Sequence, residues 1–268
     1  VENIITKLGF DLYTLVVNWE EFKDIQLAYL KASVVDIEVV SDHAIFATMY
    51  KLDSKKKIGY VLSGTNVVTE HIMPPSWLYK KMDFANLKAI HDQFGKKKLK
   101  TYPTFDFKKY VYYSAVLKLN PISILNYVPY NKQEVKEIIK KELDWKDYGG
   151  KHYESIFTKF YQAYILPRKF RIDKRKAHLS TLICSGQMSK EEALKELQKP
   201  LYDAVELASD KEYVLKKLGL SEEDFEMIMH LPIRRHDEFK TDTHLKEGYM
   251  NLLKKTERIR RIIKPKKQ

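Results

Sequence analysis

Hydroxyl, amide and carboxylate side chains follow a short apolar run that ends in Gly64. The stretch SGTNVVTE places Thr65, Asn66 and Glu70 directly after this glycine. Gly64 lets the backbone turn sharply and approach a ligand closely. Thr65 and Asn66 offer groups that bind a ribose, a base or a phosphate, and Glu70 is an oxygen ligand of the kind that Mg²⁺ takes beside nucleotide phosphates. The stretch therefore predicts a nucleotide-binding loop, although an ordinary turn before a helix, with Thr69 as its cap, has the same pattern.

A second group of polar residues lies between positions 147 and 187. Its glycine pair precedes a predicted helix, whose first N–H groups could bind an anion. Asp173 predicts the start of another helix, on which Lys174 and Arg175 lie about one turn before His178. Lysines and arginines around a glycine turn suit a polyphosphate or a nucleotide sugar, whereas the alternative is a solvated basic helix face with its histidine in the core. The candidate residues are Gly149, Gly150, Lys151, His152, Thr158, Lys159, Lys169, Lys174, Arg175 and His178.

The strands and helices that would position the Gly64 loop have the sequence pattern of a parallel sheet. Residues 11–17 and 58–63 have the length and β-branched content of buried strands. Between them the pattern predicts a helix after Asn18 and a second one capped by Ser41 or Asp42. This order, with continuous apolar strands, predicts an α/β fold whose parallel sheet is covered on both faces. Ligands of such a sheet bind at the carboxyl ends of its strands, where SGTNVVTE falls.

The pattern changes after Pro103. The pattern of residues 104–262 predicts mostly helices, with one strand at 123–128. One of the predicted helix breaks is at Pro167, within the stretch LPRKF. The predicted layout is an α/β nucleotide-binding core over residues 1–103, a mostly helical region for substrate or partners over 104–262, and a basic tail over 263–268.

The composition and net charge of the chain limit the kinds of molecule that it is expected to bind. The chain of 268 residues carries 48 Lys plus Arg against 36 Asp plus Glu, a net charge of +12. This surplus favours anionic partners, namely nucleic acid, an anionic membrane surface or phosphate-bearing small molecules. The segment KKTERIRRIIKPKKQ carries eight basic residues and one acidic one, and its simplest interpretation is a solvated helix end. No apolar run approaches the ~20 residues of a membrane span, and a single cysteine, Cys184, excludes an internal disulfide. A cytoplasmic location is expected.

Three stretches carry a resemblance to a known family. SDHAIFATMYKL, SGTNVVTE and the long segment from Gly149 to Leu194 resemble the N-acetyl sugar amidotransferases, which are PP-loop (adenine nucleotide alpha hydrolase-like) ATP pyrophosphatases. The resemblance implies a parallel-sheet PP-loop core followed by a mostly helical C-terminal region. It also implies an ATP-dependent conversion of an acetamido group on a nucleotide-activated sugar into an acetamidino group. The expected reagents are ATP, Mg²⁺ and ammonia from glutaminase-type subunits, and the product would enter bacterial surface glycans such as O-antigen or flagellin modifications.

The same resemblance assigns roles to the residues above. Glu70 would ligate Mg²⁺, and Gly64, Thr65, Asn66, Asp42 and His43 would line the nucleotide site. Glu70, Lys174, Arg175 and His178 form the expected catalytic set. Gly149, Gly150, Lys151, His152, Thr158, Lys159 and Lys169 would bind the substrate. The family's phosphate loop, Ser-Gly-Gly-x-Asp-Ser, does not occur in the chain, and its expected place is upstream of Val1, so these residues alone are expected to be inactive.

Two other classes of function compete with this interpretation. The net charge of +12 and the basic tail also suit an RNA-binding or tRNA-modifying PP-loop protein. A noncatalytic scaffold that binds partner subunits is the third alternative. Nucleic acid is the less favoured partner because the basic residues are spread over the chain rather than gathered in one stripe.

Overall fold

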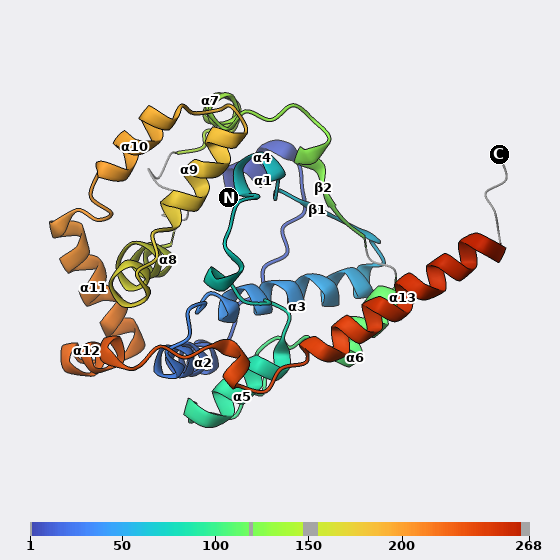
Figure 1. Cartoon of the computed structure of the whole chain (residues 1–268), viewed down its shortest axis with the longest axis horizontal. Helices are drawn as coiled ribbons and strands as arrows, with labels where there is room; N and C mark the ends of the chain where they lie inside the picture. The colour runs from blue at the N-terminus through green and yellow to red at the C-terminus, as the bar shows by residue number, and fades with distance from the viewer. Residues whose placement is uncertain (1, 118–119, 147–154, 264–268) are drawn as a thin grey trace.

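The computed structural model describes residues 2–117, 120–146 and 155–263, and this part of the chain is mostly helical (Figure 1). The α-helices are α1 (Glu2–Leu8), α2 (Trp19–Ala32), α3 (Val39–Lys56), α4 (Val67–Glu70), α5 (Phe84–Phe94), α6 (Phe107–Val111), α7 (Lys132–Leu143), α8 (Ile156–Phe160), α9 (Lys174–Cys184), α10 (Lys190–Gln198), α11 (Ala204–Leu218), α12 (Glu222–His230) and α13 (Thr243–Ile263). Segments Tyr112–Leu117 and Tyr161–Phe170 are π-helical, and Pro75–Trp77, Ile124–Asn126 and His236–Glu238 are single 3-10 turns.

The predicted parallel-sheet PP-loop core is wrong. The described residues contain one sheet of two short strands, β1 (Tyr60–Ser63) and β2 (Asn120–Ser123), which pair in parallel. β1 confirms the strand predicted over 58–63, but the strand predicted over 123–128 lies earlier, because a 3-10 turn follows Ser123. With only two strands, most backbone groups are satisfied within helices, so this part of the chain belongs to the mostly helical class.

The apolar run at residues 11–17 is not a strand. It is extended chain between α1 and α2, and its side chains face solvent, with Val16 86% exposed. A short apolar run has the composition of a buried strand. A strand also needs a neighbouring strand whose backbone groups form hydrogen bonds with its own, and composition alone does not provide that neighbour. No described strand lies beside it, and the run stays unpaired.

Most helix starts follow the expected capping chemistry. Asn18 accepts a hydrogen bond from the Glu21 N–H at 3.1 Å and begins α2 as predicted, and Asp173 begins α9 in the same way. α3, in contrast, starts at Val39, so Ser41 and Asp42 lie inside its first turn and cap nothing. Pro167 does not break its helix. The segment Tyr161–Phe170 continues through the proline because the wider π turn accommodates a residue that lacks an N–H.

One hydrophobic core joins the N-terminal and C-terminal halves of the chain. Its fully buried members include Tyr29 and Val39 from the first hundred residues and Phe160, Leu166 and Phe225 from the helical part. The Tyr161 hydroxyl donates to the carbonyl of Val35 at 2.5 Å, which satisfies the polar end of a buried ring. The π-helical segment therefore lies at the centre of the fold, and α9 follows directly from it.

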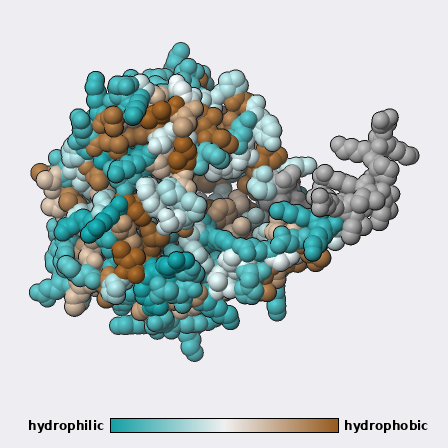
Figure 2. Space-filling model, viewed as in Figure 1, coloured by the Kyte–Doolittle hydropathy of each residue, from teal (hydrophilic) through white to brown (hydrophobic). Residues whose placement is uncertain are grey.

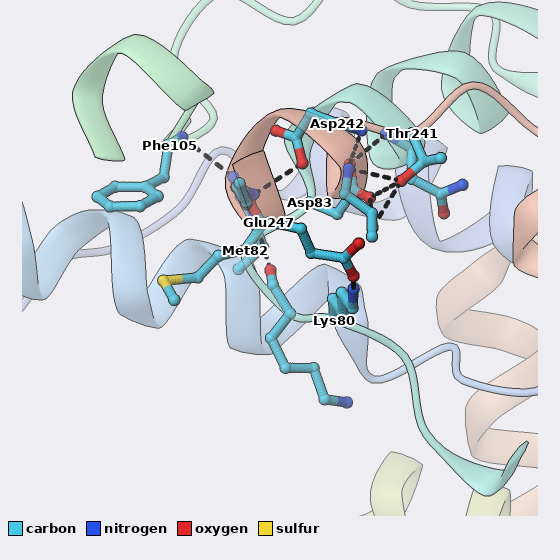
Figure 3. A network of polar contacts seen from close by, with 12 residues as sticks. Lys80, Met82, Asp83, Phe105, Thr241, Asp242 and Glu247 are labelled. Atoms are coloured by element: carbon cyan, nitrogen blue, oxygen red, sulfur yellow. Dashed lines mark hydrogen bonds and ion pairs between the residues drawn. The ribbon is translucent and has the colours of Figure 1, made fainter. Parts of the chain in front are cut away.

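A buried polar network ties α5 to the start of α13 (Figure 3). Asp83 caps α5 through the Asn86 N–H at 3.0 Å, and it also accepts from the Thr241 hydroxyl and from the backbone N–H of Asp242 at 3.3 Å. Burial alone would raise the pKa of Asp83, but these donors outweigh burial and lower it. The network holds segments about 160 positions apart in one arrangement.

Candidate functional site

A cavity of about 600 Å³ lies where the π-helical segment, α9 and the connection from α10 to α11 meet. It gathers four of the candidate residues in the second polar group of the sequence, namely Lys159, Lys174, Arg175 and His178. Its polar lining consists of Lys132, Lys159, Gln162, Asp173, Lys174, Arg175, His178, Glu196, Lys199, Tyr202, Asp203 and Glu206. The cavity is the strongest candidate site in the described part of the chain, because convergent polar groups in a concave pocket are the usual signature of ligand binding.

Lys174 lies at the start of α9 with its side chain only 8% exposed. Its ammonium contacts the Glu38 carboxylate at 2.9 Å, and the Gln162 amide donates to the same carboxylate at 3.0 Å. Burial alone would raise the pKa of Glu38, but Lys174 and Gln162 outweigh burial and lower it. Glu38 therefore fixes both cavity side chains in place while it stays ionised.

Lys159 forms a second charged pair on the cavity wall. Its ammonium lies 2.8 Å from Glu206 and 3.1 Å from Asp210, and it lies over the Tyr202 ring at 4.6 Å. Burial would lower the pKa of Lys159, but the hydrogen bonds to the two carboxylates outweigh burial and raise it. The lysine is charged at neutral pH, and the Tyr202 ring and the Glu206 carboxylate beside it also line the cavity.

Arg175 binds the end of α10. Its guanidinium pairs with Asp173 at 2.8 Å and donates to the carbonyls of Lys199 at 2.8 Å and Glu196 at 3.3 Å. Both carbonyls lie at the C-terminal end of α10, where a cation is favourable, and the Glu196 carbonyl also accepts the Lys199 N–H at 3.2 Å. Arg175 lines the cavity, but its contacts give it the role of closing the wall that α10 forms.

The charges of the cavity nearly balance. Each of its central basic groups, Lys159, Lys174 and Arg175, is paired with at least one carboxylate. A bare polyphosphate would have to compete with these carboxylates, whereas a sugar offers hydroxyls that both donate to carboxylates and accept from ammonium groups. His178 and Tyr202 also line the cavity. The arrangement therefore fits a neutral, hydroxyl-rich ligand better than a highly charged one.

The loop predicted to bind a nucleotide packs against the same helix, α9. α4 packs against α9, and the Ile72 N–H, just after α4, donates to the Thr181 hydroxyl at 3.2 Å. Because Lys174 begins α9 and Thr181 lies near its end, this helix connects the cavity to the loop. The two predicted groups of residues are therefore neighbours through one helix.

The hydroxyl groups of the loop bond to one another at the carboxyl ends of β1 and β2. The Thr65 hydroxyl lies 2.8 Å from that of Ser63 and 3.1 Å from that of Ser123. Asn66, rather than Thr69, caps α4 by accepting from the Thr69 N–H at 2.8 Å. Gly64 is exposed, as its predicted role beside a ligand requires. The Asn66 side chain, in contrast, is buried and serves as the helix cap.

Glu70 is the predicted Mg²⁺ ligand at this loop. The described residues contain no group of three or more His, Cys, Asp or Glu side chains that could hold a metal. Mg²⁺ in nucleotide sites often needs only one or two carboxylates, because phosphates and water supply the other oxygens. A half-buried Glu70 at the end of α4 fits that limited role.

Asp42 and His43, the other predicted nucleotide contacts, belong to buried networks. Asp42 pairs with Lys81 at 3.0 Å; burial raises the pKa of Asp42 although Lys81 opposes the shift. His43 donates from Nδ1 to the Lys81 carbonyl at 2.9 Å, and its Nε2 accepts from the Phe105 N–H at 3.1 Å. Both ring nitrogens of His43 are thus occupied within the fold.

Acidification is expected to destabilise the protein through His43 and His236. Burial lowers the pKa of His43 to about 4 and that of His236 to about 3, both below the ordinary 6.5. Between these values the unfolded chain binds a proton that the folded chain excludes, so stability falls as the pH falls from 6.5, by up to about 1.4 kcal/mol per pH unit for each histidine. Urea unfolding across this pH window measures the slope. His43→Gln should flatten the slope and the exposed His230→Gln should leave it unchanged; equal slopes in all three proteins would contradict the assignment.

The remaining predicted residues divide into three groups. Thr158 lines a neighbouring, more apolar cavity of about 560 Å³ beside Trp19 and Tyr213. Lys169 donates to the carbonyls of Ile228, Met229 and Leu231, at 2.5, 3.2 and 3.0 Å, and so caps the end of α12. Gly149, Gly150, Lys151 and His152 lie outside the described residues.

Sequence reasoning missed the acidic half of the cavity. Glu38 lies 136 positions from Lys174, and Glu206 lies 47 positions from Lys159, so no local pattern links these partners. Tyr202 was also missed. Asp173, which lies beside the predicted residues, was recognised only as a helix start.

The comparisons with known proteins point to the same part of the chain. No curated protein and no solved structure gives a significant match. Residues 154–256 match the sequence model of a family described as "LPS biosynthesis protein WbpG-like, C-terminal domain". The matched segment holds α8 to α12 and most of the cavity lining. The match supports a relationship of this segment to a WbpG-like family of LPS biosynthesis proteins.

Proposed function

We propose that this chain acts in LPS biosynthesis as part of an ATP-dependent amidotransferase, and that the cavity beside α9 binds the sugar part of a nucleotide-activated N-acetyl sugar. One observation carries the proposal: Lys159, Lys174 and His178, chosen from sequence, line a single cavity. The match of residues 154–256 to a WbpG-like LPS biosynthesis domain supports the biological setting. The balanced charges of the cavity support a sugar as the group that enters it.

The proposed reaction replaces the oxygen of the acetamido group by nitrogen. ATP, when bound with Mg²⁺, would activate the amide oxygen by adenylation and release pyrophosphate. Ammonia from a glutaminase-type subunit would then form the new C–N bond, and the oxygen would leave with AMP. An amide oxygen is a poor leaving group without such activation, so the sugar and the nucleotide must lie close together.

The residues of this chain would divide the work between the cavity and the loop that packs against α9. On the cavity side, Lys159 and Lys174 would bind sugar hydroxyls while their carboxylate partners orient them. His178 would accept the proton that ammonia loses. On the loop side, Thr65 would contact the nucleotide and Glu70 would hold Mg²⁺. The contact between α4 and α9 would keep the two sides in register.

The test is an assay of amidine formation by the protein in its full encoded length. The mixture contains a nucleotide-activated N-acetyl sugar, ATP, Mg²⁺ and ammonium, and mass spectrometry follows exchange of O for NH in the sugar. We expect AMP and amidine in equal amounts, with neither formed when the sugar lacks its acetamido group. AMP formation that ignores the sugar, or salt-sensitive binding of RNA without any amidine, would contradict the proposal.

A further inference from the structure

α13 is anchored at its start and projects beyond the body of the molecule (Figure 1). Lys246 donates to the Met82 carbonyl at 2.6 Å and pairs with Asp242 at 2.9 Å, and Lys80 pairs with Glu247 at 3.1 Å (Figure 3). The Tyr249 ring packs edge-on against Phe107 at 6.3 Å. These contacts fix the direction of the helix, so its outer part has a defined orientation relative to the body.

The part of α13 after Tyr249 leaves apolar side chains partly exposed to solvent. Leu252 is 58% exposed, Met250 is 40% exposed and Leu253 is 37% exposed. Consecutive leucines on a projecting helix cost solvation free energy in water. Figure 2 shows a mainly hydrophilic side of α13 toward the viewer. The helix therefore combines exposed leucines with a polar face, as amphipathic helices at an interface do.

Basic residues follow the leucines directly. Lys254 and Lys255 are both exposed, and the sequence from Lys254 to Gln268 contains eight basic residues and one acidic one. A cluster of four to eight Lys or Arg beside apolar residues is attracted by an anionic lipid surface. No described helix is long and apolar enough to cross a membrane. Contact with such a surface would be peripheral.

We propose that α13 binds the surface of an anionic phospholipid bilayer, with Leu252 and Leu253 entering the interface and the lysines facing the headgroups. Charge complementarity selects this occupant. A second copy of the helix would bring two strongly basic segments together, which like-charge repulsion disfavours. RNA would satisfy the positive charge but would leave the leucine pair exposed to water. The bilayer is the occupant that satisfies both features of the helix.

The experiment is flotation of the intact chain with vesicles of phosphatidylcholine, with and without phosphatidylglycerol. We expect binding to the anionic vesicles only, and loss of binding at high salt. Lys254→Gln with Lys255→Gln should weaken the partition coefficient roughly 30-fold, as expected for two lysines near an anionic surface. The matched control is Lys55→Gln with Lys56→Gln, an exposed lysine pair in the last turn of α3, which should bind like the original chain.

A second pair of variants tests the apolar contribution. Leu252→Ser with Leu253→Ser should weaken vesicle binding roughly tenfold or more, since the interface would lose two leucines. Leu194→Ser, at an exposed leucine of α10, should have no effect. Equal binding to neutral vesicles, or no vesicle binding at all, would overturn the proposal. So would salt-sensitive binding of poly(U) RNA in its place, or a dimer in light scattering that the Leu252 and Leu253 substitutions dissociate.

Discussion

Replacing Lys81 by methionine is expected to destabilise the protein by about 3–5 kcal/mol, because it leaves a buried carboxylate without its counter-ion. The Lys81 ammonium lies 2.8 Å from both carboxylate oxygens of Asp36, whose side chain is fully buried. It also lies 3.0 Å from Asp42. Burial would lower the pKa of Lys81, but these two carboxylates outweigh burial and raise it. Urea unfolding at neutral pH measures the change.

The matched control for Lys81 is a pair on the surface. Lys88 and Asp92 are both more than half exposed, so Lys88→Met should cost less than about 1 kcal/mol. The double variant Lys81→Met with Asp36→Asn should recover part of the lost stability, because the neutral amide no longer carries an unpaired charge. If Lys81→Met cost no more than Lys88→Met, the Asp36–Lys81–Asp42 cluster would not be the buried ion pair described here.

Local patterns predicted helices and their starts well. α2 begins after Asn18 and α9 begins after Asp173, where a side-chain oxygen accepts the N–H groups that a helix leaves unpaired. Lys174, Arg175 and His178, which are spaced within about one helical turn, all line the same cavity. Such features depend on residues three or four positions apart, and the sequence contains that information directly.

Features that depend on distant partners could not be predicted. The run at 11–17 has strand composition, yet a strand needs a neighbour, and none of the described strands pairs with it. The acidic partners of the cavity lysines lie far away in the sequence, and so do the groups that bind His43. Lys169 and Arg175 were predicted to act at the ligand site because the sequence shows their charge. The sequence does not show that their side chains bind the carbonyls at the ends of distant helices.

The account depends most on the claim that the cavity beside α9 binds the sugar, and Lys159 tests it. Lys159→Met removes an ammonium group from the cavity wall while Tyr202, Glu206 and Asp210 remain. The loss of a charge-assisted hydrogen bond to a sugar hydroxyl is expected to weaken binding by roughly 10- to 100-fold. The unfolding free energy should change less, because Glu206 is 61% exposed and can be solvated, and Asp210, which is 17% exposed, keeps the hydrogen bond from the Tyr202 hydroxyl at 2.8 Å.

Lys211 provides an unusually close control. It pairs with Glu222 at 2.5 Å and Glu226 at 3.3 Å, lies over the Phe225 ring at 5.4 Å and has a side-chain exposure of 18%, against 12% for Lys159. It does not line the cavity. Lys211→Met therefore repeats the loss of a paired, partly buried lysine and its ring contact, and any difference between the two variants reports on the cavity.

The decisive measurement is calorimetric titration of the protein and these two variants with a nucleotide-activated N-acetylhexosamine. The account predicts saturable binding by the original chain, a 10-fold or greater loss in Lys159→Met, and unchanged affinity in Lys211→Met. Equal affinities in all three proteins, or a loss of the same size in both variants, would contradict the assignment of the sugar to this cavity.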